Sequence, residues 1–350
     1  MLLDGLQLPL TTPFYPDGRL NLLKLEHNVA RYSKAPVSGL VALSEFGEQT
    51  MLSDDETREV LRIVVGAAGA EKVLVAGVSR DSVAGTLDIT ESAAKCGYDA
   101  VLVKRPSVLP GVGRRGTKEL VTYFQAVADR AALPVVLYDS GSEELLPVEV
   151  TIELAGHPQV IGLVECAGGR ERFAALSAGT AGVKRRVEVT AVFAAVTGRM
   201  RVHDEDAAGG LIAADSLTGG AGVAVAPVKP AVKTRTKLAG FQILSGRTTG
   251  VLEGLRAGAV GAMPGFAASA PQACYEVLAA WKDGDEGLAE EKQIRLDHIV
   301  QRVEEELGVA GIKFGCDLNG YFGGNPRLPL LPLKGDERAE IESLMQGLRN

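Results

Sequence analysis

Four residues with reactive side chains stand at or just after the ends of short apolar runs in this sequence: Glu45, Lys104, Tyr138 and Glu165. A tyrosine hydroxyl can relay a proton, and paired carboxylates can act as acid and base or hold a divalent cation. A lysine at the same edge of a sheet can bind an anion, here together with the neighbouring Arg105, or can form a Schiff base with a carbonyl group. These residues outline a candidate catalytic site, provided that the fold gathers them.

Each of these residues also has a structural interpretation. Tyr138 can be a packing tyrosine whose hydroxyl bonds to the backbone. Lys104 can be solvated or ion-paired, and Glu45 and Glu165 can be its partners and those of Arg105. The residue types alone do not choose between these alternatives, so the elements that position them decide.

Eight β-type apolar runs, each followed by a helical pattern, predict a parallel sheet that is covered on its outer face. A count of eight favours a closed (β/α)8 TIM barrel, in which the carboxyl ends of all the strands surround one site. The expected strands are Leu6–Thr12, Gly39–Leu43, Val73–Gly77, Ala100–Val103, Val135–Tyr138, Ile161–Val164, Phe241–Ser245 and Val260–Met263. The barrel is expected over residues 1–270.

Additional C-terminal helices are expected over residues 271–350, because helical patterns continue after the eighth strand. They are Pro271–Lys282, Glu286–Leu307 and Glu337–Leu348. A barrel does not require them, so we expect them to cover one flank or to form a subunit contact.

A β-rich insertion, residues 183–239, separates strands six and seven of the expected barrel. It carries nine Lys or Arg and five Asp or Glu, although the whole chain has a net charge of −7. Because Arg170–Ser177 already forms the sixth helix pattern, the insertion should leave the face opposite the catalytic one. Its His203-Asp204-Glu205-Asp206 run is interpreted as a solvated charge run, and no metal site is predicted.

Composition excludes several classes of protein. The net charge of −7 disfavours binding to nucleic acid or to an anionic membrane surface, and no apolar run is long enough to span a bilayer. The first residues contain no basic region ahead of an apolar one. The four cysteines form no Cys-x-x-Cys pair, which fits reduced thiols. We therefore expect a cytoplasmic protein with no membrane or nucleic-acid partner.

Four groups of motifs make the chain resemble the dihydrodipicolinate synthase and N-acetylneuraminate lyase family. They are Leu10–Phe14 with Asp17-Gly18, Gly47-Glu48 with Leu52–Glu56, Leu133–Tyr138, and a last group of Leu244–Gly246, Gly258–Gly261, Gly320–Phe322 and Arg327–Leu333. The resemblance implies a barrel with added C-terminal helices that forms a homo-oligomer, a dimer or tetramer. It also implies a lysine Schiff base with a 2-keto acid, and a strand-five tyrosine, here Tyr138, that relays protons.

The chain departs from that family at the residues that carry the chemistry. The strand-six lysine falls at Val164, which cannot form an imine. The family's Gly-Thr-Thr-Gly-Glu turn, which holds the keto-acid carboxylate, falls at Ser44–Glu48, where Glu45 would repel a carboxylate. The expected arginine after strand five is absent. The candidate catalytic residues are therefore Tyr138, which the resemblance implies, and Lys104 and Glu165, which are candidates because they stand at strand ends. The candidate substrate-binding residues are Thr12, Ser44, Glu45, Phe46, Gly47 and Arg105.

Two hypotheses of function follow. The first is a lyase or aldolase that acts on a small oxo-acid or sugar-derived substrate without the usual lysine, and without a cofactor unless a divalent metal binds. The second is a catalytically inactive barrel that serves as a binding or scaffold subunit. Under both hypotheses, dihydrodipicolinate synthase activity itself is expected to be absent, because Val164 removes the reactive amine.

Overall fold

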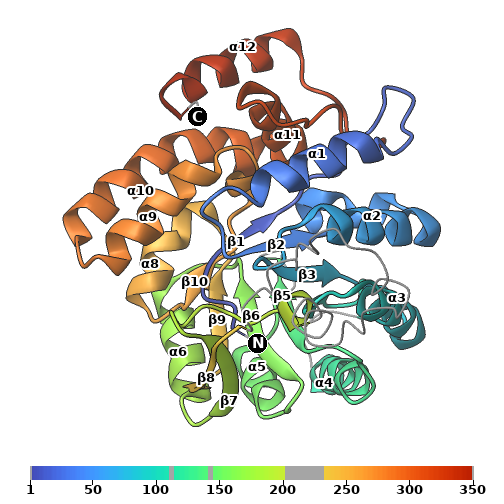
Figure 1. Cartoon of the computed structure of the whole chain (residues 1–350), viewed down its shortest axis with the longest axis vertical. Coiled ribbons are helices and arrows are strands. Elements are labelled where there is room, and N and C mark those ends of the chain that lie inside the picture. Colours follow the sequence, from blue (N-terminus) through green and yellow to red (C-terminus); the bar gives the residue numbers. More distant parts are fainter. Residues whose placement is uncertain (1, 110–113, 141–144, 202–231, 349–350) are drawn as a thin grey trace, which may run out of the picture.

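Eight parallel strands close into a barrel, as the sequence predicts (Figure 1). The structure is a computed structural model that describes residues 2–109, 114–140, 145–201 and 232–348. Around the barrel the strands follow the order β1 (Gly5–Pro9), β2 (Gly39–Ala42), β3 (Val73–Gly77), β4 (Ala100–Lys104), β5 (Val135–Asp139), β6 (Val160–Glu165), β9 (Gln242–Ser245) and β10 (Gly261–Ala262). The predicted (β/α)8 fold class is therefore confirmed.

Helices cover the outside of the barrel between successive strands. They are α1 (Leu22–Tyr32), α2 (Asp54–Ala67), α3 (Val83–Cys96), α4 (Arg114–Ala128), α5 (Val148–Ala155), α6 (Arg170–Thr180) and α8 (Val251–Arg256). The start of α2 is explained by a complete capping box, in which Ser53 accepts from the amide of Glu56 and Glu56 accepts from the amide of Ser53.

The C-terminal helices lie on the flank of the barrel that α1 also covers (Figure 1). They are α9 (Pro271–Lys282), α10 (Glu286–Val300), α11 (Gly308–Leu318) and α12 (Gly335–Leu344). The predicted single helix Glu286–Leu307 is regular only to Val300, because Gln301–Glu306 forms a π-helix. Sequence periodicity does not distinguish one widened turn from a regular one.

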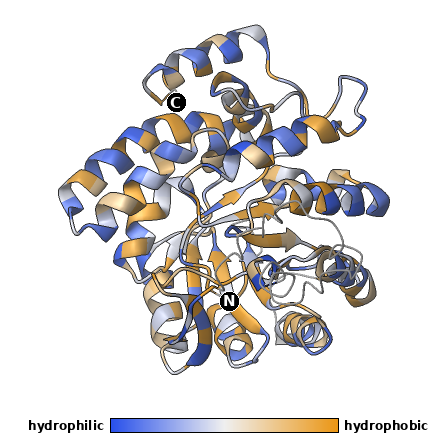
Figure 2. Cartoon of the chain, viewed as in Figure 1, coloured by the Kyte–Doolittle hydropathy of each residue, from blue (hydrophilic) through white to orange (hydrophobic). Residues whose placement is uncertain are grey.

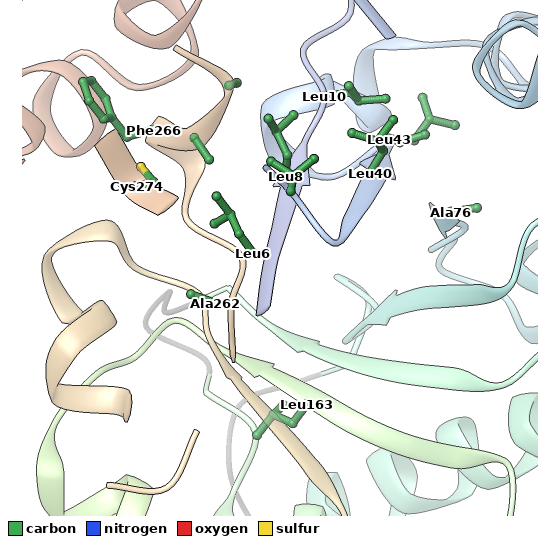
Figure 3. Packing of buried hydrophobic residues seen from close by; sticks show 14 of the residues in the cluster. Leu6, Leu8, Leu10, Leu40, Leu43, Ala76, Leu163, Ala262, Phe266 and Cys274 are labelled. Carbon is green, nitrogen blue, oxygen red and sulfur yellow. The ribbon is translucent and has the colours of Figure 1, made fainter. Parts of the chain in front are cut away.

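Alternation along each strand divides the apolar side chains into two layers. One layer packs between the barrel and the helices and includes Leu8, Leu40 and Leu163 (Figure 3). The other fills the barrel interior and includes Leu102, Tyr138 and Val164. Apolar residues accordingly concentrate on the strands, while the outer helix faces are hydrophilic (Figure 2). A residue next to an inward-facing one on a strand therefore points to the helices.

The insertion begins and ends as a two-stranded antiparallel hairpin, β7 (Arg185–Thr190) and β8 (Thr234–Ala239). Arg185 donates to the carbonyls of Ala155 and His157, at the end of α5, and Arg199 donates to those of Ala68 and Lys72, beyond the end of α2. These contacts lie at the amino-terminal end of the barrel, opposite the carboxyl ends of the strands. The His203–Asp206 run lies outside the described residues.

Candidate active site

A cavity of about 500 Å³ opens at the carboxyl ends of β2, β3, β4 and β5. The segments that follow these four strands form its wall: Glu45, Gln49, Thr50 and Leu52 after β2; Ser79, Arg80 and Asp81 after β3; Lys104, Arg105, Pro106 and Ser107 from β4; Tyr138, Asp139, Ser140 and Leu146 from β5. Lys104, Arg105, Tyr138 and Glu45 of the predicted site therefore share one cavity. Of the segment that replaces the expected arginine, residues 141–144 lie outside the described residues.

Tyr138 and Glu45 are in direct contact at this wall. The Tyr138 hydroxyl donates a hydrogen bond of 3.1 Å to Oε2 of Glu45. Burial, then the nearby Cys166 and Glu45, raises the pKa of Tyr138 well above its usual value, so the phenol stays protonated at neutral pH. Glu45 is exposed, with its carboxylate at the cavity. The pair joins a protonated donor to a carboxylate acceptor.

Lys104 stands beside Tyr138, because the two residues are partners in the register between β4 and β5. Both lie on the inward face, next to Leu102 and Val136 of the barrel interior. Among the described residues no carboxylate forms an ion pair with Lys104, although its positive charge contributes, after hydrogen bonds from Ser107, to holding the pKa of Asp81 below its usual value. Lys104 therefore places a cationic side chain on the strand next to Tyr138, at the paired position.

Arg105 belongs to the same wall, and part of its guanidinium is already hydrogen-bonded to the backbone. Its Nη2 donates to the carbonyl of Leu109 at 2.8 Å. Ser107 donates its amide and hydroxyl to the carboxylate of Asp81, at 2.6 and 2.7 Å. These bonds tie the segment after β4 to the segment after β3 and set the shape of the wall.

The turn after β2 positions Glu45 in the cavity wall, whereas the next three residues, Phe46–Glu48, do not line the cavity. Thr12 donates to the carbonyl of Gly47 at 2.7 Å, and the ring of Phe46 lies over Gly265, where a side chain would collide with it. Ser44 lines a smaller, adjoining hollow of about 110 Å³ together with Tyr138 and Lys104. The substrate-binding set thus divides into wall residues and residues that support the turn.

This turn has an unusual backbone. Leu43 and Glu48 have φ values of 60° and 56°, in the left-handed region that bulky residues seldom adopt. Gly77 of β3 passes so close that a Cβ there would lie 1.9 Å from the carbonyl oxygen of Leu43. Such conformations persist only where surrounding contacts hold them, and they cluster at functional sites.

Two residues of the C-terminal region hold this turn: Lys313, which the sequence did not single out, and Arg327, which begins the last of the family motifs. The Lys313 ammonium forms an ion pair with Glu48, and both side chains are fully buried. The Arg327 amide donates to Glu48 at 2.7 Å, and its guanidinium donates to the carbonyl of Met51. The signal that sequence reasoning could have used is a lysine inside the apolar stretch of α11.

Glu165 lies outside the cavity. It follows Val164 on β6, so alternation turns it toward the helices, where it is fully buried. Its oxygens accept from the amides of Ala167 and Gly168 at 2.9 and 3.0 Å, and from Arg172 at 3.0 Å. The structure therefore does not bring Glu165 together with Tyr138 and Glu45, and its contacts fit a role in ordering the turn after β6.

Val164 occupies the barrel interior directly beside Tyr138, its partner in the register between β5 and β6. Val164 and Cys166 are buried, and Gly246 approaches so closely that a Cβ there would lie 2.1 Å from the Cys166 sulfur. Burial raises the pKa of Cys166 well above its usual value, which keeps it a thiol. Small apolar groups thus fill the mouth at β6, and the open cavity lies toward β2–β5.

Within the described ranges, no group of three or more His, Cys, Asp or Glu side chains is arranged to hold a metal ion. No helix in the described part of the chain is long and apolar enough to cross a membrane.

A (β/α)8 barrel with a polar cavity at the carboxyl ends of its strands has the architecture of a barrel enzyme. The model of the dihydrodipicolinate synthetase family matches residues 2–181 and 223–348, and the chain belongs to that family. The match omits residues 182–222, which include most of the predicted insertion.

Individual relatives agree along nearly the full length of the chain. It is 27% identical to a 4-hydroxy-tetrahydrodipicolinate synthase of Acidiphilium cryptum, over 98% of each chain. It is also 27% identical to an L-threo-3-deoxy-hexylosonate aldolase of Hypocrea jecorina, over 99% of this chain and 95% of that one. The structure of a dihydrodipicolinate synthase from Bacillus anthracis superposes with a TM-score of 0.78 over 100% of both chains at 18% identity, and so supports the fold.

Proposed function

We propose that this protein is a lyase of the aldolase type that acts on a small oxo-acid or sugar-derived substrate without a strand-six Schiff base. The observation that carries the proposal is the Tyr138–Glu45 hydrogen bond in the wall of a cavity that Lys104 also lines. An acid–base pair next to a cation is what cleavage of a carbon–carbon bond beside a carbonyl group requires. The family membership and the aldolase among the relatives support the same class of reaction.

The proposed step is an aldol cleavage. The oxygen of Tyr138 takes the proton of a substrate hydroxyl while the phenolic proton passes to Glu45. The carbon–carbon bond next to that hydroxyl breaks, the hydroxyl carbon becomes an aldehyde, and the bonding electron pair forms an enolate on the carbonyl fragment. The Lys104 ammonium stabilises the enolate oxygen. Tyr138 then donates its proton to the enolate carbon and takes back the proton held by Glu45, which releases the carbonyl product and restores the pair. In this proposal Glu165 orders the turn after β6 and does not contact substrate.

A second candidate function is an inactive barrel that serves as a binding or scaffold subunit. It is favoured by Val164, which removes the reactive amine, and by Glu45, which opposes a carboxylate in the turn after β2. The open cavity beside Tyr138 argues against it, because a barrel that has lost its substrate has no need to keep a polar hollow of this size.

Borohydride trapping with pyruvate, other 2-keto acids and aldehydes, read by intact mass and peptide mapping, tests the role of Lys104. We expect no stable adduct, and an adduct on Lys104 would show that the Schiff base has moved to β4. A parallel screen of hydroxylated keto acids for aldehyde release tests the lyase itself. Absence of cleavage across the screen, with the cavity still binding keto acids, would favour the inactive barrel.

Condensation of pyruvate with aspartate semialdehyde is expected to be undetectable, and its detection would contradict the proposal. We also propose a small-molecule substrate, a homo-oligomer that is a dimer or tetramer, and a cytoplasmic location. Sedimentation velocity of the purified chain measures the oligomer, and fractionation of cells measures the location.

A further inference from the structure

A second hollow, of about 490 Å³, lies at the opposite end of the barrel, beneath the turn that follows β7. One side of it comes from residues at the amino-terminal ends of the strands, among them Asp4, Lys72 and Val73. The other side comes from the turn at the end of β7 and the residues after it: Thr190, Val192, Phe193, Ala194, Ala195 and Met200. That side belongs to the stretch that the family match omits, so the hollow is a feature of this chain's own insertion.

The hairpin is held at a defined place over the barrel. Thr197 donates to the carbonyl of Ala70, and the amide of Gly198 donates to Asp99 at 2.9 Å. Asp99 also accepts from the amide of Leu74 in β3. Together with the hydrogen bonds of Arg185 and Arg199, these contacts hold the insertion against the barrel on both sides. A space nevertheless remains beneath the turn that follows β7. The hollow is therefore built by anchored elements.

The turn that follows β7 presents apolar side chains to this space. Val192 and Phe193 line it, although 82% and 51% of their surfaces remain exposed. Phe193 has a φ of 63°, a conformation that a bulky residue adopts only when neighbouring contacts impose it. Two hydrogen bonds within the turn hold this conformation. The Thr190 carbonyl accepts from the amide of Phe193, and the Thr190 hydroxyl accepts from the amide of Ala194. Strained residues of this kind cluster at functional sites, ligand clamps among them. The Phe193 ring also has the guanidinium of Arg235 at 5.7 Å from its centre.

The barrel side presents a buried cation. Lys72 is only 9% exposed, and its ammonium donates to the carbonyls of Ala35 and Val37 at 3.1 and 2.9 Å. An ammonium group has three donors, and the nearest carboxylate oxygen, on Glu71, is 3.8 Å away, beyond hydrogen-bond distance. Glu71 is therefore an ion-pair partner without a direct hydrogen bond, and burial lowers the pKa of Lys72 more than the charge of Glu71 raises it.

A second cation lines the same hollow. Lys282, at the end of α9, is exposed, and no ion pair of its ammonium group is seen among the residues that the structure describes. Two ammonium groups on one side and an aromatic and aliphatic surface on the other match a ligand with one anionic group and an apolar body. We propose that this hollow binds a small carboxylate with an apolar body, with the carboxylate at Lys72 and Lys282 and the body against Phe193 and Val192.

Asp4 and Glu71 also line the hollow, so the ligand can carry an α-ammonium group in addition to its carboxylate. Both kinds of ligand carry a carboxylate, and two probes distinguish a ligand that has an amino group from one that has none. Isothermal titration of the full-length protein with 3-phenylpropionate and with L-phenylalanine measures binding without and with the amino group. Phenethylamine, which has the ring but no carboxylate, is the cationic control.

We expect saturable binding of at least one carboxylate, and at least tenfold weaker binding of phenethylamine, which cannot use the two lysines. Lys282→Met should weaken binding about tenfold, the loss typical of one charge-assisted hydrogen bond. Phe193→Gly should weaken it comparably while keeping the fold, because glycine adopts a φ of 63° without strain. Lys237→Met is the matched control: it removes an exposed hairpin charge that does not line the hollow.

The catalytic cavity also contains cations, so the location needs its own variant. Lys104→Met should leave binding of the probe unchanged. The proposal is overturned if neither carboxylate binds, if phenethylamine binds as tightly, or if Lys104→Met abolishes binding. Binding that both Lys282→Met and Phe193→Gly leave unchanged, with melting temperatures that show folded proteins, also overturns it. None of these outcomes depends on whether the protein has lyase activity.

Discussion

Lys313 of α11 and Glu48 of the turn after β2 form an ion pair in which neither side chain reaches solvent. The lysine also donates to the carbonyl of Asn325 at 3.0 Å, and its ammonium lies 4.4 Å from the ring centre of Phe14. The pair joins the C-terminal helices to the strained turn that presents Glu45 to the cavity. The C-terminal region is therefore part of the support of the candidate site.

Removing one partner of this pair should be costly. Lys313→Met leaves the Glu48 carboxylate buried without its counter-charge, and we expect a loss of about 3–5 kcal/mol in the free energy of unfolding. The double variant Lys313→Met, Glu48→Met should be less destabilised than the sum of the single variants, because no charge remains buried. Urea unfolding of the four proteins measures the coupling. Additive losses would show that the pair is not energetically coupled.

Tyr138 and Glu45 should act as one unit in catalysis. Tyr138→Phe and Glu45→Gln are each expected to lower turnover about 10²- to 10⁴-fold on a substrate found in the cleavage screen, and the double variant no further than the worse single. Tyr98→Phe is the control, since its hydroxyl bonds to the carbonyl of Leu61 away from the cavity. Initial rates and melting temperatures of all variants check this. A Tyr138→Phe enzyme with normal turnover would remove the proton relay.

Arg199, which anchors the insertion to the barrel, should contribute to stability although it lies far from the candidate site. Arg199→Met removes donors from the carbonyls of Ala68 and Lys72, and we expect a loss of about 1–3 kcal/mol. Arg186→Met, at an exposed position of the same hairpin, should change stability by less than about 0.5 kcal/mol. Urea unfolding compares the two. Equal effects would mean that the hairpin contributes nothing to the barrel through Arg199.

Glu304 of the π-helix predicts a pH dependence of stability. It accepts hydrogen bonds from the Thr248 hydroxyl and, at 2.9 Å, from the amide of Phe266, but burial raises its pKa from 4.5 to about 7. The folded state thus binds this proton more tightly than the unfolded state. The resulting stabilisation is fully present below about pH 4.5 and is lost as the pH rises through about 7.

Glu304→Gln should remove that part of the pH dependence. Between pH 5 and pH 8 the wild-type protein should lose about 1–3 kcal/mol more stability than the variant does. Glu305→Gln is the control, because Glu305 is paired with Arg247 at a more exposed position. Unfolding in urea across this pH range supplies the comparison. Parallel curves for wild type and Glu304→Gln would contradict the assigned titration.

The positions of the strands follow from the sequence because each strand is a short apolar run between turn and helix signals. Its period-two alternation could also have separated Glu165 from its neighbour Val164, since adjacent strand residues face opposite sides of a barrel wall. The same alternation correctly associates Lys104 with Tyr138 once the register between β4 and β5 is known. Register is a contact between strands, and one strand's sequence does not contain it.

The sequence by itself determined the barrel, the apolar residue Val164 on β6 and the place of the insertion, because each depends on local residue type and order. Only the tertiary structure decided that the cavity lies toward β2–β5, that Glu45 rather than Glu165 contacts Tyr138, and that Lys313 supports the turn. These are contacts between side chains far apart along the chain. They exist only when closure of the barrel and docking of the C-terminal helices bring the side chains together.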